Sequence, residues 1–188
     1  MRPSKRDQLV RKALEVFYRN GFHATGMDML VVETGVSKTS MYKYFKSKEE
    51  LIVAVLKLRD ENFRNWFINR IEELASTPRD KLIVMFDALR EWFAQPDYCG
   101  CMFINASAEY QNLDHPIHMQ AAEHKRLLFD YFLGLAKDTG ASDPSALVRQ
   151  LLLLKEGAIV TAHLGHTKDP AGDAKSAAQA LAAEFIAQ

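Results

Sequence analysis

Residues 30–51 of the chain read LVVETGVSKTSMYKYFKSKEEL, and their spacing predicts two short helices joined by a sharp turn. The first helix is expected to end at Gly35, because glycine readily adopts the left-handed conformation that closes a helix. Ser37 has the residue type that caps a helix, and it is followed by a second short helix over 38–45. The segment therefore predicts a helix-turn-helix.

The sequence on either side of this pair is also helical in its spacing. Residues 9–17 carry apolar side chains on one face, which predicts an N-terminal helix. Thr25 with Asp28 three positions later predicts a capping box for the helix before the turn. Ser47 opens a Ser-x-x-Glu capping box, and a long helix with an apolar stripe is expected over 51–74.

Met41 is expected to hold the helix over 38–45 against its neighbours, which leaves the polar side chains of that helix pointing outward. Such a helix fits the major groove of DNA, where its side chains reach base edges and phosphates. Lys43 and Thr39 are expected to read bases, and Lys48 to contact a phosphate. The predicted DNA-binding residues are Thr25, Ser37, Lys38, Thr39, Ser40, Tyr42, Lys43, Tyr44 and Lys48.

The charge of the chain is unevenly distributed. The formal net charge is zero, with 24 Lys and Arg against 24 Asp and Glu. Residues 1–48 carry ten basic and four acidic side chains, so this part has a charge of +6 and the remainder has −6. A basic N-terminal part indicates a polyanionic partner, which would repel the acidic remainder.

The segment around the turn resembles the DNA-binding signature of the TetR family of bacterial transcriptional regulators. The likeness covers about residues 6–52 and rests on Gly21-Phe22 together with residues 30–51. A second segment, 100–106, resembles the GC-x-F-x-N pattern of one branch of the family.

Three positions depart from the family pattern. Val31 and Thr34 stand where the family usually has alanine, and they could tilt the helix before the turn. Thr39 stands where a small residue, often glycine, is common, so it bears on which bases are read.

The resemblance implies an all-α fold with two domains. Residues 1–48 would form a three-helix DNA-binding domain, and residues 49–188 a larger helical domain that binds a small effector and dimerises. The implied function is a ligand-responsive, dimeric transcriptional regulator, expected to be a repressor, on a palindromic double-stranded DNA operator. A small, largely hydrophobic effector would release it.

An effector pocket is expected to be mostly apolar with a few polar groups. Most large apolar side chains of the body are nevertheless expected in the core. The predicted pocket residues are Phe63, Phe67, Phe86, Trp92, Phe93, Phe103, Asn105, Tyr110, His118 and His163.

Helices are expected over 144–164 and from residue 170 to the C-terminus. Stripes of small and apolar residues on them suit either packing within one chain or a four-helix interface between two subunits. The predicted homodimer residues are Leu151, Leu154, Ala158, Ala162, Ala178, Leu181 and Phe185.

Other classes find less support in the sequence. Signatures of phosphate-binding loops, dinucleotide sites, serine hydrolases and zinc proteases are absent, and two His-x-x-His pairs lack further ligands. We therefore expect no enzyme activity, no cofactor and no metal site. Cys99 and Cys101 are expected to be unreactive thiols.

No apolar run is long enough to span a membrane, and a cytoplasmic protein is expected. The alternative is a helical small-molecule-binding protein or an enzyme whose basic head is not used on DNA. A protein–protein adaptor is a third possibility.

Overall fold

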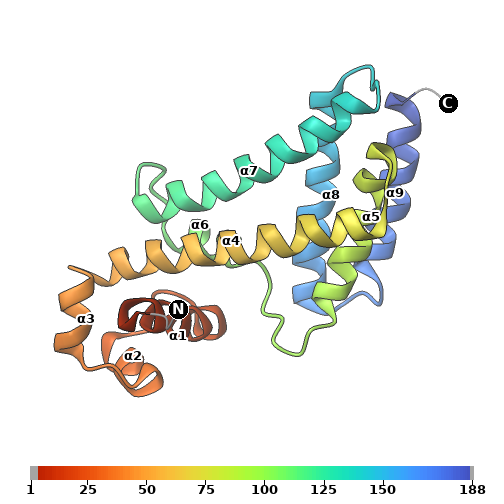
Figure 1. Ribbon diagram of the computed structural model, residues 1–188. Helices are drawn as coiled ribbons and strands as arrows, with labels where there is room; N and C mark the ends of the chain where they lie inside the picture. Colours follow the sequence, from red (N-terminus) through yellow and green to blue (C-terminus); the bar gives the residue numbers. More distant parts are fainter. Residues whose placement is uncertain (1–3, 187–188) are drawn as a thin grey trace. The chain divides into compact units, whose positions relative to one another are not determined.

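The computed structural model describes residues 4–186, and these residues form helices joined by turns and loops (Figure 1). The all-α prediction is confirmed. The helices are α1 (Lys5–Asn20), α2 (Met27–Thr34), α3 (Lys38–Tyr44), α4 (Lys48–Leu74), α5 (Pro78–Phe93), α6 (Met102–Glu109), α7 (Pro116–Asp138), α8 (Pro144–Leu164) and α9 (Pro170–Phe185). Among the described residues, none of these helices combines the length and hydropathy needed to cross a membrane.

The chain divides into two compact units. Unit 1 holds the described residues up to Phe63 together with Met102–His124, so it contains α1–α3, the first part of α4, α6 and the first part of α7. Unit 2 holds Arg64–Cys101 and the described residues from Lys125 onward. These two units differ from the predicted domains, 1–48 and 49–188, which were defined by function. The predicted functional division stays a prediction.

Unit 1 has its core where α1, α2 and α3 meet the start of α4. The largest side chains in this core are fully buried, namely Leu9, Phe17, Phe22, Leu30, Met41, Leu51, Ile52 and Leu56. The first helix is closed at its start by Ser4, whose hydroxyl accepts the N–H of Asp7. Each of these short helices depends on this shared core, because so few turns are marginal in isolation.

Two predicted capping boxes have different outcomes. The hydroxyl of Ser47 accepts the N–H of Glu50 at 3.2 Å, as predicted, while the Glu50 carboxylate accepts from Lys46 N–H. The predicted box at Thr25 is wrong. The residue that caps α2 is Gly26, without a side-chain bond, because the Thr25 hydroxyl donates to the carbonyl oxygen of Gly21 instead.

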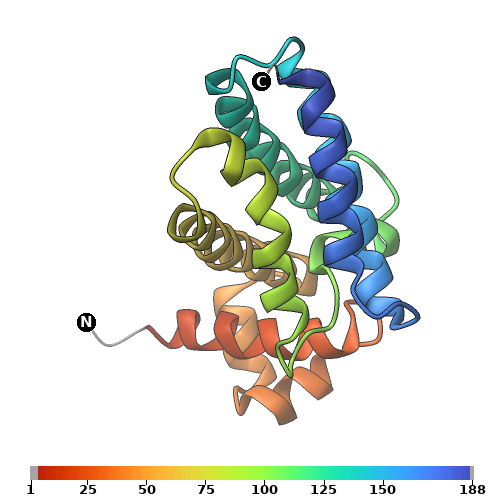
Figure 2. The same ribbon diagram turned by 90° about the vertical axis from the view of Figure 1, so that its right-hand side faces the viewer.

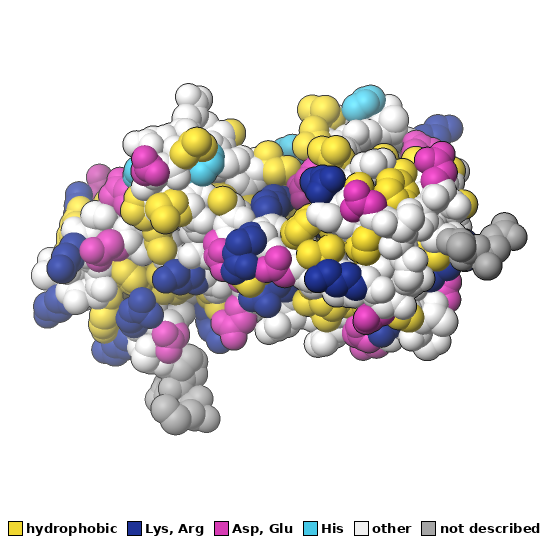
Figure 3. Space-filling view, turned by 90° about the horizontal axis from the view of Figure 1, so that it is seen from above, with side chains coloured by type: hydrophobic (Ala, Val, Ile, Leu, Met, Phe, Trp, Pro, Cys, Tyr) yellow, Lys and Arg dark blue, Asp and Glu magenta, His cyan; other side chains and the backbone are white. Residues whose placement is uncertain are grey.

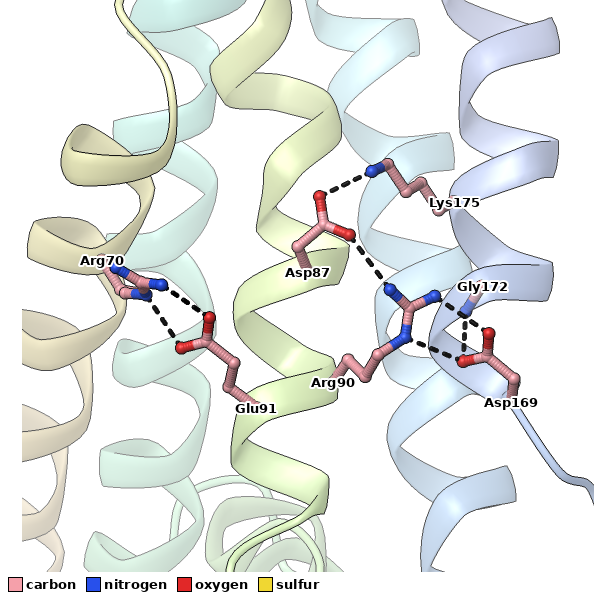
Figure 4. A network of polar contacts seen from close by, with 7 residues as sticks. All are labelled: Arg70, Asp87, Arg90, Glu91, Asp169, Gly172 and Lys175. Atoms are coloured by element: carbon pink, nitrogen blue, oxygen red, sulfur yellow. Dashed lines mark hydrogen bonds and ion pairs between the residues drawn. The ribbon is translucent and has the colours of Figure 1, made fainter.

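Unit 2 is a bundle in which α5, α8 and α9 run side by side (Figure 2). Ion pairs fasten its outer surface (Figure 4): Arg70 on α4 pairs with Glu91 on α5, and Lys175 on α9 pairs with Asp87 on α5. Arg90 also reaches Asp169, the residue that caps α9. Such exposed pairs contribute little each, so apolar packing between the helices supplies most of the stability.

Candidate nucleic-acid interface

The outer face of α3 is almost entirely polar. Only Met41 is buried among its seven residues, and Lys38, Thr39, Tyr42, Lys43 and Tyr44 are exposed, while Ser40 is half-buried. The Ser37 hydroxyl accepts the N–H of Ser40 at 3.3 Å, which fixes the start of the helix. The chain becomes extended at Phe45, which is buried. These contacts place the hydrogen-bonding side chains of α3 on a surface that another molecule can reach.

The turn before α3 is fixed by Gly35 and Thr34. Gly35 has a φ of 69° and closes α2 in the left-handed conformation, as predicted. The buried Thr34 hydroxyl donates to Leu30 O at 2.6 Å and accepts the N–H of Val36 at 3.2 Å. Threonine, which stands here in place of the family's usual alanine, therefore supplies two hydrogen bonds within the turn itself.

A groove of about 640 Å³ lies between α1 and α3. Its residues include three lysines and no carboxylate, and they are Lys5, Gln8, Lys12, Thr34, Gly35, Val36, Ser37, Ser40, Lys43 and Tyr44. Lys12 Nζ donates to Thr34 O at 2.8 Å, so one lysine also braces the turn. An acid-free groove beside α3 favours an anionic ligand.

Sequence reasoning missed the α1 side of this groove. Lys5, Gln8 and Lys12 are spaced three and four residues apart, so they share one face of α1. This spacing is visible in the sequence, and it could have identified the α1 side of the groove. In the view of Figure 3, Lys and Arg side chains lie among Asp and Glu side chains on the surface of unit 1.

Thr25 and Lys48 have contacts inside unit 1. Thr25 is 0% exposed. Lys48 is half-buried, and its Nζ donates to the carbonyl oxygens of Phe22 at 2.8 Å and Thr25 at 3.0 Å. These contacts hold the α1–α2 loop, and they speak against direct DNA contact by Thr25. The contact of Lys48 with a phosphate stays a prediction, and so do those of the predicted residues on or directly before α3, whose positions on its accessible face support them.

Five of the predicted pocket residues lie in unit 1: Phe63, Phe103, Asn105, Tyr110 and His118. The Phe103 ring stacks on His124 with centroids 3.7 Å apart, and Phe63 meets the same imidazole edge-on at 6.0 Å. His124 Nδ1 lies 2.7 Å from Asp60 Oδ1, and both side chains are buried. Sequence reasoning missed this His–Asp pair, although His124 follows Ile117 by seven residues on the buried face of α7.

The other five lie in unit 2: Phe67, Phe86, Trp92, Phe93 and His163. The first three are buried, Phe93 is half-buried and His163 is exposed beside Gly100. A groove of about 600 Å³ in unit 2 is lined instead by the end of α4, the start of α5 and α9. The effector pocket therefore stays a prediction.

An ionic cluster around the buried Lys155 in unit 2 was also missed. Lys155 is 1% exposed and pairs with Glu156 at 2.5 Å, and Lys125 pairs with the same carboxylate at 2.7 Å. Burial would raise the pKa of Glu156, but the two ammonium groups lower it to about 2. Burial lowers the pKa of Lys155. Cys101 is buried, with its sulfur 3.6 Å from Lys125 Nζ.

The predicted dimer residues fall into two groups. Leu151, Ala158 and Ala178 are buried within this chain, whereas Leu154, Ala162, Leu181 and Phe185 are half-buried. The exposed large apolar side chains of α8 are Leu153, Val160 and Leu164. Within residues 4–186, no group of three or more His, Cys, Asp and Glu side chains could hold a metal ion.

Known proteins share both the DNA-binding segment and the whole fold. Residues 9–55 match the sequence pattern of the family described as bacterial regulatory proteins, tetR family. The HTH-type transcriptional regulator YjdC of Escherichia coli is 24% identical over 155 residues, which are 82% of this chain and 81% of that protein.

Two solved structures extend the likeness over nearly the full length. A TetR transcriptional regulator of Streptomyces avermitilis is 31% identical, with a TM-score of 0.84, over 97% of this chain and 100% of that one. A TetR-family regulator of Streptomyces coelicolor is 25% identical, with a TM-score of 0.86, over 96% of this chain and 89% of that one. These relatives are described as transcriptional regulators.

Proposed function

Since the chain belongs to the TetR family of bacterial regulatory proteins, we propose that this DNA-binding transcriptional regulator acts as a dimeric repressor on a palindromic operator. The observation that carries the proposal is the polar outer face of α3 beside the lysine-lined groove. In this arrangement α3 enters the major groove, and the side chains that flank it contact the two phosphate strands.

Base reading is assigned to Lys38, Thr39 and Lys43, which are exposed on α3. Lysine donates to the guanine acceptors and threonine serves several bases. Phosphate contacts are assigned to Ser37, Ser40, Tyr42, Tyr44, and to Lys5 and Lys12 of α1. Thr25 and Lys48 act indirectly, because their contacts hold the loop that ends α1.

A dimer places two copies of α3 on one operator. The apolar face of α8 formed by Leu153, Val160 and Leu164 is exposed in the single chain, and its spacing of seven and four residues puts it on one side of the helix. We assign the dimer interface to this face together with the half-buried Leu154, Ala162, Leu181 and Phe185. Leu151, Ala158 and Ala178 instead support packing within each subunit.

Footprinting of the DNA that flanks the protein's own gene tests the proposal. Two protected half-sites related by a twofold axis are expected, with centres one helical turn of about 10 bp apart or a multiple of it. A single half-site, or protection that spreads evenly over the fragment, would contradict a dimer on a palindrome.

Release by a small, largely hydrophobic effector completes the proposal. The predicted pocket residues combine large apolar rings with a few polar groups, which is the combination such a ligand needs, while Phe103 and the Asp60-paired His124 are packed in the interior of unit 1. Hydrophobic compounds that raise the melting temperature should weaken operator binding by about 5- to 150-fold. Compounds that stabilise the protein but leave operator binding unchanged would contradict this part.

A further inference from the structure

The loop between α1 and α2 is held from two sides by charged groups distant in the sequence. Glu109, the last residue of α6, accepts the N–H of Phe22 with both carboxylate oxygens, at 2.9 and 3.1 Å, and the N–H of His23 at 2.5 Å. Lys48 Nζ takes the carbonyl oxygens of Phe22 and Thr25. One anion thus binds two N–H groups of the loop, and one cation binds two of its carbonyl oxygens.

The close approach of Glu109 depends on Gly21. This residue has a φ of 78°, and a Cβ added to it would lie 3.0 Å from Glu109 Oε1. Phe22 is fully buried and packs 5.6 Å from the Phe17 ring, so the loop is anchored to α1 as well. Glycine followed by a large apolar residue therefore leaves room for a carboxylate while it fixes the backbone in place.

Aromatic stacking links the α1–α2 loop to the connection between α6 and α7 as well. The His23 ring stacks on Tyr110 at 4.7 Å, and Tyr110 stacks on His115 at 4.8 Å. His118 Nδ1 lies 2.8 Å from the carbonyl oxygen of Tyr110. Burial, with the nearby charges of Glu49 and Glu109, raises the pKa of Tyr110 to about 12, so the phenol is neutral across the physiological range.

We propose that Glu109 is a positioning residue for DNA recognition, because its carboxylate fixes the α1–α2 loop, and with it α1–α3, on the end of α6. The inference rests on the proposed function, since it assumes that two correctly placed copies of α3 read an operator. Hydrogen bonds from N–H groups to a carboxylate are stronger than those to a neutral acceptor. Without them, α1–α3 stays folded and packed on α4 but is no longer held in one orientation relative to α6.

The test compares Glu109→Gln with wild type and with the control Glu61→Gln. Glutamine keeps the shape but turns an NH₂ donor towards N–H groups that need an acceptor. Glu61 is an exposed carboxylate of α4 in the same unit, so the control makes the same change in charge. Fluorescence anisotropy gives the affinity for a duplex from the protein's own promoter and for a shuffled duplex.

The Glu109→Gln variant should lose about tenfold or more in the ratio of promoter to shuffled affinity, which is within the range of ordinary coupling between sites. Its affinity for the shuffled duplex and all properties of Glu61→Gln should stay unchanged. A preserved ratio, or an equal loss on both duplexes, overturns the inference alone. A wild type that does not discriminate between the duplexes overturns the proposed function and this inference with it.

Amide hydrogen exchange provides a measurement that does not involve DNA. The amides of Phe22 and His23 should be protected in wild type and should exchange about tenfold faster or more in Glu109→Gln, while the amide of Met41 in α3 is unaffected. Unprotected Phe22 and His23 amides in wild type would show that the carboxylate does not hold the loop. Faster exchange at Met41 as well would show that the variant unfolds α1–α3, which would contradict a purely positioning role for Glu109.

Discussion

In the proposed complex with DNA, the side chains of α1 and α3 divide into those that read bases and those that neutralise phosphates. Replacing Lys43 by alanine should cost about 1–3 kcal/mol on the preferred DNA and relax the choice of base, because a lysine at a base edge discriminates between sequences. Anisotropy titrations on single-base variants of the operator measure this effect. An equal loss on specific and random DNA would make Lys43 a phosphate contact.

Lys5→Ala should behave differently, because Lys5 lies on the α1 side of the groove. Its loss should weaken binding to every sequence alike and reduce the slope of log affinity against log salt by about 1. Lys137→Ala, an exposed lysine of unit 2, serves as the control and should leave the slope unchanged. A change in base preference in Lys5→Ala would place this residue in the groove of the duplex.

The half-buried Glu156, which pairs with the fully buried Lys155, makes a prediction about stability and pH. Glu156→Gln should destabilise the protein at pH 7 by roughly 3–5 kcal/mol, because Lys155 and Lys125 lose their anion inside unit 2. The folded-state pKa of Glu156 lies at about 2, below its ordinary value of 4.5. The stabilisation is therefore fully present above about pH 4.5 and is lost as pH falls towards 2.

Urea denaturation at pH 7 and pH 3 measures both effects. The difference between wild type and Glu156→Gln should shrink at the lower pH. Glu61→Gln is again the control and should stay within about 0.5 kcal/mol of wild type. A difference that does not depend on pH would contradict the role of the carboxylate charge.

At the scale of elements, the turn between α2 and α3 depends on backbone conformation. Gly35→Ala should cost about 1–2 kcal/mol, because Gly35 has a φ of 69° where a side chain is strained. Gly134→Ala should instead stabilise by about 0.5–1 kcal/mol, because Gly134 lies within α7 with open space around its Cα. Opposite shifts of the urea midpoint are expected, and a stabilising Gly35→Ala would contradict the strained turn.

Elements defined by local signals could be predicted from the sequence. The turn at Gly35 and the starts of α8 and α9 at Asp-Pro follow from capping and backbone chemistry, which act over a few residues. The box at Thr25 was wrong because its hydroxyl donates to Gly21 O, and the sequence alone does not reveal whether a hydroxyl accepts an N–H of the following helix or donates to a preceding carbonyl oxygen. Glu109 could not be found either, since its partners lie 86 and 87 residues away.

The faces of α8 show a second reason why sequence reasoning stops short. This helix is apolar on more than one side, so its spacing does not tell which stripe packs inward. Leu151 and Ala158 turn out to be buried, and Leu153 and Val160 are exposed. The pairing of His124 with Asp60 could not be predicted for another reason, because the two residues are 64 positions apart in the chain.

For the whole molecule, the proposed dimer predicts a paired experiment. Leu153 on α8 and Leu113 in the α6–α7 connection are each 72% exposed, so they are matched in residue type and exposure. Leu153→Glu should convert the protein to a monomer, because it places a charge in an apolar interface, while Leu113→Glu should remain a dimer. Light scattering after size-exclusion chromatography measures the mass, and a dimeric Leu153→Glu would contradict the assigned interface.

The most direct measurement is the preference for a specific duplex, made with wild type and with a variant that combines Thr39→Ala and Lys43→Ala. Labelled promoter DNA and its shuffled counterpart are titrated at one fixed salt concentration. Wild type should bind the promoter about 10³-fold more tightly or better, and the double variant should lose most of that preference while it keeps its affinity for shuffled DNA. Equal binding of both duplexes by wild type, or an undiminished preference in the variant, would contradict operator recognition through α3.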